Sequence, residues 1–131
     1  MKKINTIDVI ALEWRDKING NSYFAGTVTV NFALPDERTY YMPFQYGYGD
    51  HYQDMAFALL REVGEITDMK RHENGMWTSR WEWAKENGVI VRYTKHEKCK
   101  NSELKPFTKL AEQAKKEAQK SISQTFTPDQ I

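Results

Sequence analysis

The sequence is poor in the residues that cross-links, metal sites and membrane segments require. It has one cysteine, three histidines and four prolines among 131 residues. One cysteine excludes an internal disulfide, and the lack of an uncharged apolar run of about 18 residues excludes a membrane-spanning helix. Asp8 and Glu13 interrupt the N-terminal stretch in which a secretory signal needs an unbroken apolar segment. We therefore expect a protein of a reducing compartment, the cytoplasm.

Signatures of catalysis are also missing. The chain has no phosphate-binding glycine loop followed by lysine, no nucleophile elbow, no dinucleotide fingerprint and no paired zinc ligands. Cys99 has only His96 nearby as a base, which is weak support for a catalytic pair. Asp50, His51 and Asp54 could grip a divalent metal or let His51 act as a general base, but helix capping by Asp50 beside a solvated histidine is the simpler interpretation. The sequence predicts no catalytic residue, no metal and no cofactor.

What is present is typical of one globular domain. Apolar residues make up 40% of the chain, aromatic residues 13% and charged residues 28%. This composition supplies the large side chains that offset the entropy lost on folding. We expect a single α+β domain over residues 1–122 and a frayed tail over residues 123–131, where no periodicity remains.

The first third of the chain reads as three strands. Residues 6–14 (TIDVIALEW) carry apolar side chains on both faces, which favours a central strand. Asn19 and Gly20 readily adopt the positive φ angles of a tight turn, and alternating residues follow them, so a β-hairpin is expected. Residues 39–44 (TYYMPF) form a third strand, and Pro43, which lacks an amide donor, places it at a sheet edge or a strand end.

Helical patterns dominate the remainder. Residues 44–60 (FQYGYGDHYQDMAFALL) read as a strand, a glycine turn and a helix that ends near Gly64. Residues 89–94 form a fourth strand, and residues 102–122 form a helix with Pro106 in its first turn. The predicted order is β-β-β-α-α-β-α. We therefore predict an α+β fold in which an antiparallel sheet of about four strands has its helices packed on one face.

A short helix rich in tryptophan lies between the glycine-turn helix and the fourth strand. Ser79 and Glu82 have capping-box spacing, and Trp77, Trp81 and Ala84 fall on one side, which is expected to be buried. The remaining tryptophan cannot share that side. An alternative is that all the tryptophans of this segment pin the helix to the sheet.

The tyrosines around the glycine turn are the best candidates for a binding surface. Gly47 and Gly49 force the backbone to turn, so we expect Tyr46, Tyr48 and Tyr52 to point outward, although core packing could claim any of them. Trp83, off the buried side of its helix, is expected at the surface beside Arg80. The predicted protein-binding residues are Tyr46, Tyr48, Asp50, His51, Tyr52, Arg80 and Trp83.

Charge is unevenly distributed and supports a second interpretation. Residues 1–94 hold 11 basic and 13 acidic side chains, a balance of −2, whereas residues 95–120 hold 8 lysines and 4 glutamates, a balance of +4. Lysines near tyrosines suit single-stranded nucleic acid. Against it, the sequence pI is only 7.8, and Glu112 and Lys116 have the spacing of a solvated pair on one helix face. The nucleic-acid alternative would use Lys109, Lys115, Lys116 and Lys120.

Two motifs resemble those of small uncharacterised proteins encoded by bacteriophages and prophages. In that group a W-x-D-K-x-x-GNSYF hairpin is followed by a YGYGD turn before a helix, and the likeness covers about residues 7–60. The second half of the chain has no recognised counterpart. The residues that fall on the motifs are Trp14, Asn19, Gly20, Asn21, Tyr23, Tyr46, Gly47, Tyr48, Gly49 and Asp50.

The resemblance implies an accessory protein that acts in the cytoplasm of a bacterial host. Small proteins of that kind more often bind a host or phage protein than catalyse a reaction. We therefore expect a noncatalytic protein-binding module, such as an inhibitor of a host enzyme or defence system, that does not bind membranes. The strand edge near Pro43 could also pair with a second copy, which would give a homodimer.

Overall fold

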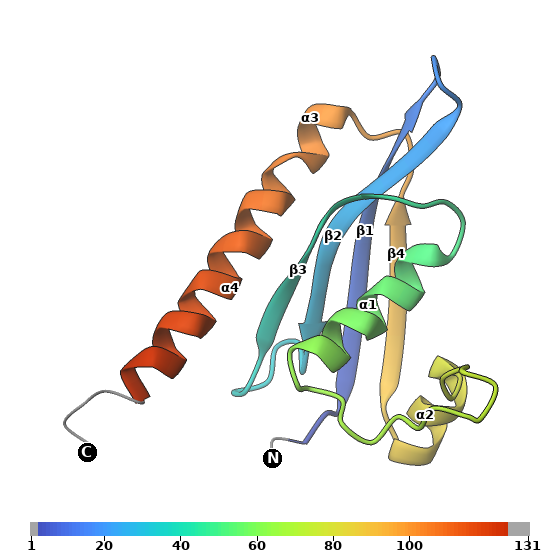
Figure 1. Ribbon diagram of the computed structural model, residues 1–131. Coiled ribbons are helices and arrows are strands. Elements are labelled where there is room, and N and C mark those ends of the chain that lie inside the picture. The colour runs from blue at the N-terminus through green and yellow to red at the C-terminus, as the bar shows by residue number, and fades with distance from the viewer. Residues whose placement is uncertain (1–2, 126–131) are drawn as a thin grey trace.

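Four strands form one sheet in the order β3-β2-β1-β4, with the helices arranged around it (Figure 1). The computed structural model describes residues 3–125, including side chains up to residue 117. The fold is α+β, and the predicted order of elements is confirmed, with a short helix, α3, preceding the last one. The elements are β1 (Thr6–Asp16), β2 (Asn21–Val30), β3 (Arg38–Tyr46), α1 (His51–Glu62), α2 (Arg80–Asn87), β4 (Ile90–His96), α3 (Asn101–Leu104) and α4 (Pro106–Thr125).

β1 and β2 form the predicted hairpin, in which Trp14 pairs with Tyr23 near the turn. The Asp16 carboxylate organises that turn, because its Oδ1 accepts hydrogen bonds from two backbone N–H groups at 3.0 and 3.3 Å. Only Gly20 of the predicted turn pair takes a positive φ, of 73°. Asn19 contributes through its side-chain amide, which donates to the Asp16 carboxylate at 2.7 Å.

The sheet is mixed, which corrects the prediction of an antiparallel sheet. β1 pairs antiparallel with β2, and β2 with β3, as short connections require. β4 runs parallel to β1, with Ile7 opposite Val91. After β3 the chain crosses the sheet through α1 and α2, so β4 enters at the same end as β3 and runs in the same direction (Figure 1). β1 is therefore a central strand, as predicted.

Pro43 lies in an outer strand of the sheet, in agreement with its missing amide donor. α4 lies beside this strand, and the hydroxyl of Thr108 accepts a hydrogen bond from the backbone N–H of Phe44 at 3.1 Å. Part of the edge at which a second copy could pair is therefore occupied by the chain's own helix.

The main core lies between the sheet and α1. Alternate side chains of a strand face the same side, and those of β1 and β2 that face α1 are fully buried. α1 ends where predicted, because Gly64 has a φ of 83°. Val63, the C-cap residue of α1, is 42% exposed. The buried residues of α1 are Tyr52, Ala56, Phe57 and Leu60.

The helices do not all pack on one face, which corrects another part of the prediction. α1 and α2 contribute to the main core, whereas Leu104 of α3 is fully buried outside it, as is Ala25 of β2. Ala25 alternates with Phe24 and Gly26, so it points to the opposite face of the sheet. α3, which contacts β1 and β2, therefore packs on that opposite face, and α4 continues along β3.

α4 runs from Pro106 to Thr125, so Pro106 lies in its first turn as predicted, whereas the predicted start at residue 102 falls in α3. The predicted frayed tail is thus helical over residues 123–125, and residues 126–131 lie outside the described residues. No helix in the described part of the chain has an apolar stretch of the length that a membrane crossing requires.

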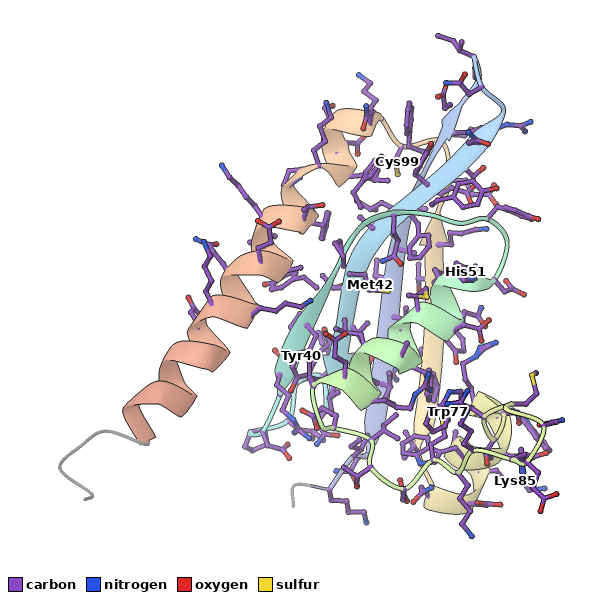
Figure 2. The ribbon with its side chains drawn as sticks, in the orientation of Figure 1. Tyr40, Met42, His51, Trp77, Lys85 and Cys99 are labelled. Atoms are coloured by element: carbon purple, nitrogen blue, oxygen red, sulfur yellow. The ribbon has the colours of Figure 1, made fainter. Side chains whose placement is uncertain are left out.

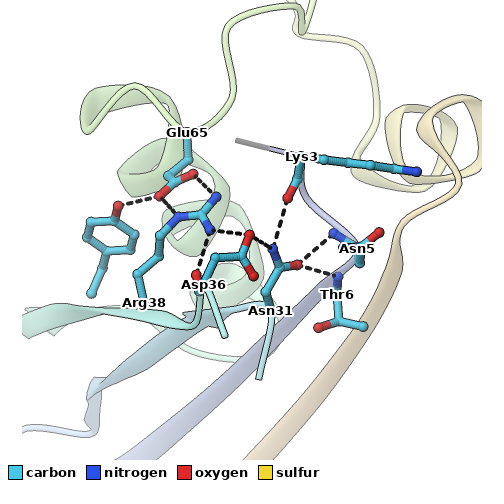
Figure 3. A network of polar contacts seen from close by, with 8 residues as sticks. Lys3, Asn5, Thr6, Asn31, Asp36, Arg38 and Glu65 are labelled. Atoms are coloured by element: carbon cyan, nitrogen blue, oxygen red, sulfur yellow. Dashed lines mark hydrogen bonds and ion pairs between the residues drawn. The ribbon is translucent and has the colours of Figure 1, made fainter. Parts of the chain in front are cut away.

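A polar network holds the end of the sheet nearest the N-terminus (Figure 3). Asn31 is fully buried and has a φ of 57°, a left-handed conformation that asparagine tolerates better than most residues. Its Oδ1 accepts hydrogen bonds from the backbone N–H groups of Asn5 and Thr6 at 2.7 and 3.2 Å. Its Nδ2 donates to the Lys3 carbonyl at 2.8 Å and to the Asp36 carboxylate at 2.9 Å. One side chain thus joins the loop after β2 to the segment before β1.

The same network continues to the segment that follows α1. Arg38 Nη2 donates to the Glu65 carboxylate at 2.7 Å, and the Tyr40 hydroxyl donates to the same carboxylate (Figure 3). Burial, together with this hydrogen bond, raises the pKa of Tyr40 to about 12. The hydrogen bond from Arg38 to Glu65 raises the pKa of the guanidinium. These groups find their partners within the protein.

Candidate functional site

The glycine turn between β3 and α1 is held in place by contacts from β2 and β4. A Cβ atom at Gly47 would lie 2.7 Å from the ring of Phe24, so any side chain there would force a neighbour to shift. The Gly47 N–H donates to the Ser22 carbonyl at 3.0 Å, and Lys95 Nζ donates to the Gly49 carbonyl at 3.2 Å. Side chains on either side of these glycines are therefore presented in fixed directions.

Five aromatic rings form a continuous series beside this turn, which we name the aromatic ladder. Trp14 stacks on Tyr23 with ring centroids 5.4 Å apart, and Tyr23 stacks on Phe44 at 5.1 Å. Tyr46 meets Tyr23 edge-on at 5.9 Å, and Tyr48 meets Tyr46 edge-on at 6.4 Å. Both arrangements are favourable for aromatic pairs. The ladder leads from three half-buried rings to Tyr46 and Tyr48, which are 56% and 69% exposed.

Tyr46 and Tyr48 thus point outward, as predicted, but Tyr52 does not. Tyr52 is 5% exposed, because it lies in the first turn of α1 on the side that faces the sheet, one turn before Ala56. Its ring meets that of Tyr93 edge-on at 6.2 Å. Tyr52 is a core residue, and its expected role at a surface is corrected accordingly.

Asp50 and His51 lie exposed where α1 begins, and Figure 2 labels His51 there. Asp50 occupies the N-cap position but makes no side-chain capping hydrogen bond, so that part of its predicted role is wrong. The ring of His51 meets that of Phe24 edge-on at 6.0 Å. Asp54 is engaged by Arg80, with 3.2 Å between Oδ1 and Nε. Among the described residues, no group of three or more histidine, cysteine, aspartate or glutamate side chains is placed to hold a metal ion.

Trp83 is buried, which corrects the prediction that it is a surface anchor. It is 4% exposed, its ring meets that of Phe57 edge-on at 5.9 Å, and its Nε1 donates to the Asp68 carboxylate at 2.9 Å. Of the residues expected on the buried side of α2, Trp81 is 70% exposed, whereas Ala84 is partly buried against the core as predicted. The alternative in which every tryptophan of this segment pins the helix is also wrong, because Trp77 is 42% exposed.

Arg80 consequently has other neighbours than the predicted tryptophan. Besides its bond to Asp54, it donates through Nη1 to the Gln53 side chain at 3.2 Å, and its Cζ lies 5.8 Å from the centre of the Tyr93 ring. These contacts tie the start of α2 to α1 and β4. The predicted site is therefore divided between the glycine turn and the surroundings of α2.

The aromatic residues near α2 associate with cations. The Arg61 guanidinium lies 4.5 Å from the centre of the Trp77 ring, and that of Arg71 lies 5.7 Å from it. Lys85 Nζ lies 5.0 Å from the centre of the Trp81 ring. Figure 2 shows Trp77 and Lys85 beside α2, well away from His51. Cation–π contacts of this kind hold exposed rings in preferred orientations.

The lysines of the nucleic-acid alternative differ in their surroundings. Lys115 pairs with Glu62 of α1 at 3.5 Å, whereas Lys109 and Lys116 are exposed on α4. The side chain of Lys120 lies outside the described residues. The pairing of Lys115 reduces the positive charge that this helix offers to a phosphate backbone.

Cys99 is half-buried between β4 and α3 (Figure 2). Its Sγ donates to the His96 carbonyl at 3.2 Å, so it is the backbone of His96 that the thiol contacts. Burial raises the pKa of the Cys99 thiol. This shift favours the protonated thiol over the reactive thiolate.

The stacking of Trp14 on Tyr23 and a groove beside α2 were not identified from the sequence. Trp14 and Tyr23 stand opposite each other in the predicted hairpin, so extending its register would have identified their stacking. The groove has a volume of about 450 Å³ and is lined by residues of three elements, including Gln53 of α1, Lys85 of α2 and Tyr93 of β4. No local motif marks it, because its residues meet only in the folded chain.

No protein-family model matches the chain, and no match was found among curated proteins or among solved structures. The function therefore has to be argued from the geometry of the described surfaces. Two of them stand out: the exposed end of the aromatic ladder, and the groove beside α2 and β4.

Proposed function

We propose that this chain is a noncatalytic protein-binding module that contacts its partner through the exposed end of the aromatic ladder. The observation that carries the proposal is the exposure of Tyr46 and Tyr48, 56% and 69%, on a turn that neighbouring strands hold in place. Tyrosine is enriched at protein interfaces because its ring adds apolar area and its hydroxyl adds a hydrogen bond. A fixed turn also reduces the entropy lost on binding.

The surface around the two rings has the composition of an interface. Asp50 and His51 are exposed at the start of α1, where they provide polar groups at the rim of a contact centred on the tyrosines. Tyr23 stacks on Phe44 at 5.1 Å and supports the Tyr46 ring, which it meets edge-on at 5.9 Å. A partner would thus meet rings that need little rearrangement.

For the partner we favour a host or phage protein in the cytoplasm of a bacterial cell, with inhibition of a host enzyme or defence system as the consequence. Support comes from the resemblance of residues 7–60 to phage-encoded proteins. Four rings of the aromatic ladder fall on the motifs of that resemblance: Trp14, Tyr23, Tyr46 and Tyr48. These four motif residues therefore belong to one connected series of rings.

The test is an affinity capture from bacterial lysate with chemical cross-linking, comparing the wild type with the Tyr46→Ala/Tyr48→Ala double variant. We expect the double variant to stay folded and to lose the captured partner. Phe32→Ala is the matched control, because Phe32 is 59% exposed in the loop at the opposite end of the sheet (Figure 1). This control should capture the same partner as the wild type.

Two results would contradict the proposal. One is a folded double variant that captures the same proteins as the wild type. The other is capture that depends on nucleic acid, falls steeply with salt and is lost in Lys109→Glu/Lys116→Glu while the tyrosine variant retains it. That second result would favour a single-stranded nucleic-acid-binding protein.

A further inference from the structure

The outer edge of β4 presents backbone groups that no strand of the described residues uses. The Ile90 N–H donates to the Asn5 carbonyl at 3.1 Å, so Ile90 and every second residue after it face β1. Backbone groups alternate in direction along a strand, and those of Val91, Tyr93 and Lys95 therefore point away from β1. Within the described part of the chain, no strand pairs with this edge. Exposed edges of this kind are templates for another extended chain.

The groove of about 450 Å³ lies beside the same edge. Val91 and Tyr93 line it from β4, and Trp81 and Lys85 line it from α2 (Figure 2 labels Lys85). Two residues whose backbone groups point outward thus also supply side chains to the groove. A chain paired with β4 would direct alternate side chains into it, because residues opposite each other in a sheet face the same side.

The charges in the groove favour an acidic side chain. Arg80 and Lys85 line it, and no aspartate or glutamate among the described residues does. Arg80 is held at 3.2 Å both by Asp54, whose side chain is 66% exposed, and by Gln53. Exposed ion pairs contribute little net free energy, so the Asp54 pair does not prevent Arg80 from also attracting a bound carboxylate. The groove therefore complements a negative charge.

We propose that the outer edge of β4 and this groove bind an extended peptide segment of another protein, with an acidic side chain placed against Arg80 and Lys85. The segment adds a strand to the sheet, so backbone hydrogen bonds supply affinity and the groove supplies selectivity. This site is separate from the exposed end of the aromatic ladder and stands whether or not that surface binds a protein.

A second copy of the chain is a poorer occupant of this edge. Residues 90–96 include Arg92 and Lys95 and no acidic residue. On the groove side of β4 a second copy would present Val91, Tyr93 and Lys95, none of which is acidic, so it would leave Arg80 and Lys85 without a negative partner. The occupant is therefore a segment of different sequence that carries negative charge.

The probe is a phage-displayed library of random heptapeptides, selected on the full chain. We expect the enriched peptides to share an acidic residue at a fixed position among β-branched and aromatic residues. The most enriched peptide is then added to the protein, and amide hydrogen exchange is followed by NMR. At a peptide concentration of about 100 times Kd, exchange at Val91, Tyr93 and Lys95 should slow roughly 100-fold. Arg92 and Thr94, already bonded to β1, should change little.

Variants separate this site from the other surface. Lys85→Glu, an exposed position, should weaken peptide binding at least about tenfold, since it places a carboxylate where the peptide's acid would lie. Lys109→Glu makes the same change in net charge on α4 and should have no such effect. Tyr46→Ala/Tyr48→Ala should bind the peptide as the wild type does.

Several results would overturn the inference. These are a selection that enriches no peptide, enriched peptides without an acidic residue, and protection that falls elsewhere than on the outward-facing amides of β4. A wild-type binding constant for Lys85→Glu would also overturn it. So would a dimer, detected by sedimentation velocity, in which these amides are protected without peptide.

Discussion

The two ends of the sheet are held by different chemistry. At the end near the N-terminus, Asn31, Arg38 and Glu65 bond to groups inside the protein, and the buried side chain of Asn31 uses both its oxygen and its nitrogen. At the opposite end, the aromatic ladder packs ring against ring and leaves Tyr46 and Tyr48 largely in solvent. The first end is joined by polar contacts among its own residues, although Phe32 is exposed there, whereas the second presents a connected series of aromatic rings.

This difference helps to separate structural roles from binding roles. A buried polar group without a partner costs about 1–3 kcal/mol, so a network that satisfies its own members is explained by stability alone. An exposed ring buries little area and adds little to folding. Tyr46 and Tyr48, fixed but uncovered, are therefore better explained by contact with another molecule. The predictions below test this contrast through the free energy of unfolding.

The largest effect is expected at the polar end, for Asn31→Gly. Glycine keeps the positive φ but leaves the N–H groups of Asn5 and Thr6 without their acceptor, which should lower the free energy of unfolding by about 3 kcal/mol. Asn31→Ala should lower it by about a further 1 kcal/mol, because alanine is strained at this φ. Urea denaturation measures both. A loss below 1 kcal/mol for the glycine variant would contradict the network's structural role.

A smaller loss is expected at the glycine turn, for Gly47→Ala. The new Cβ would meet the buried ring of Phe24, and relief of that clash should cost about 2 kcal/mol of unfolding free energy. Gly49→Ala is the matched control: its φ is 61° but no atom lies within 4 Å of the new Cβ. It should cost about 1 kcal/mol from backbone strain alone. Equal losses, measured by urea denaturation, would show that packing does not fix the turn.

Tyr40→Phe tests the polar end through pH. Removal of the hydroxyl bond to Glu65 should cost about 1 kcal/mol at neutral pH. The pKa of Tyr40 rises from 10.0 to about 12 on folding, so its contribution is complete below pH 10 and is lost as the pH rises toward 12. In that window the unfolded chain releases this proton first, and the stability of the wild type should fall more steeply than that of the variant. Parallel curves would contradict the shift.

Local signals carried the parts of the fold that could be predicted. Alternation along β2, the hairpin turn at Gly20, and the helix end at Gly64 each depend on neighbouring residues, and each is present in the structure. The direction of β4 depends on pairing with β1, more than 80 residues away in the sequence. Pairing at that distance leaves no periodic trace, so the mixed sheet could not be foreseen.

The same distinction applies to the candidate site. Tyr46 and Tyr48 could be placed outside because they flank Gly47, where the strand ends in a turn. The sequence could not show which of Trp81 and Trp83 is buried. α2 has only 8 residues, and its apolar residues do not gather on one clear face. Trp83 is the buried one because it contacts residues of other segments: its Nε1 donates to the Asp68 carboxylate, and its ring packs against Phe57.

The smallest effect on stability is expected for Tyr46→Ala/Tyr48→Ala, which makes this variant the sharpest test of the contrast. Both rings are more than half exposed, so their loss should lower the free energy of unfolding by less than about 1 kcal/mol in total. Tyr23→Ala removes a half-buried ring that stacks on both Trp14 and Phe44 and should cost about 2 kcal/mol or more. If the double variant loses as much stability as Tyr23→Ala, the exposed rings are structural after all. Their exposure would then no longer point to a partner.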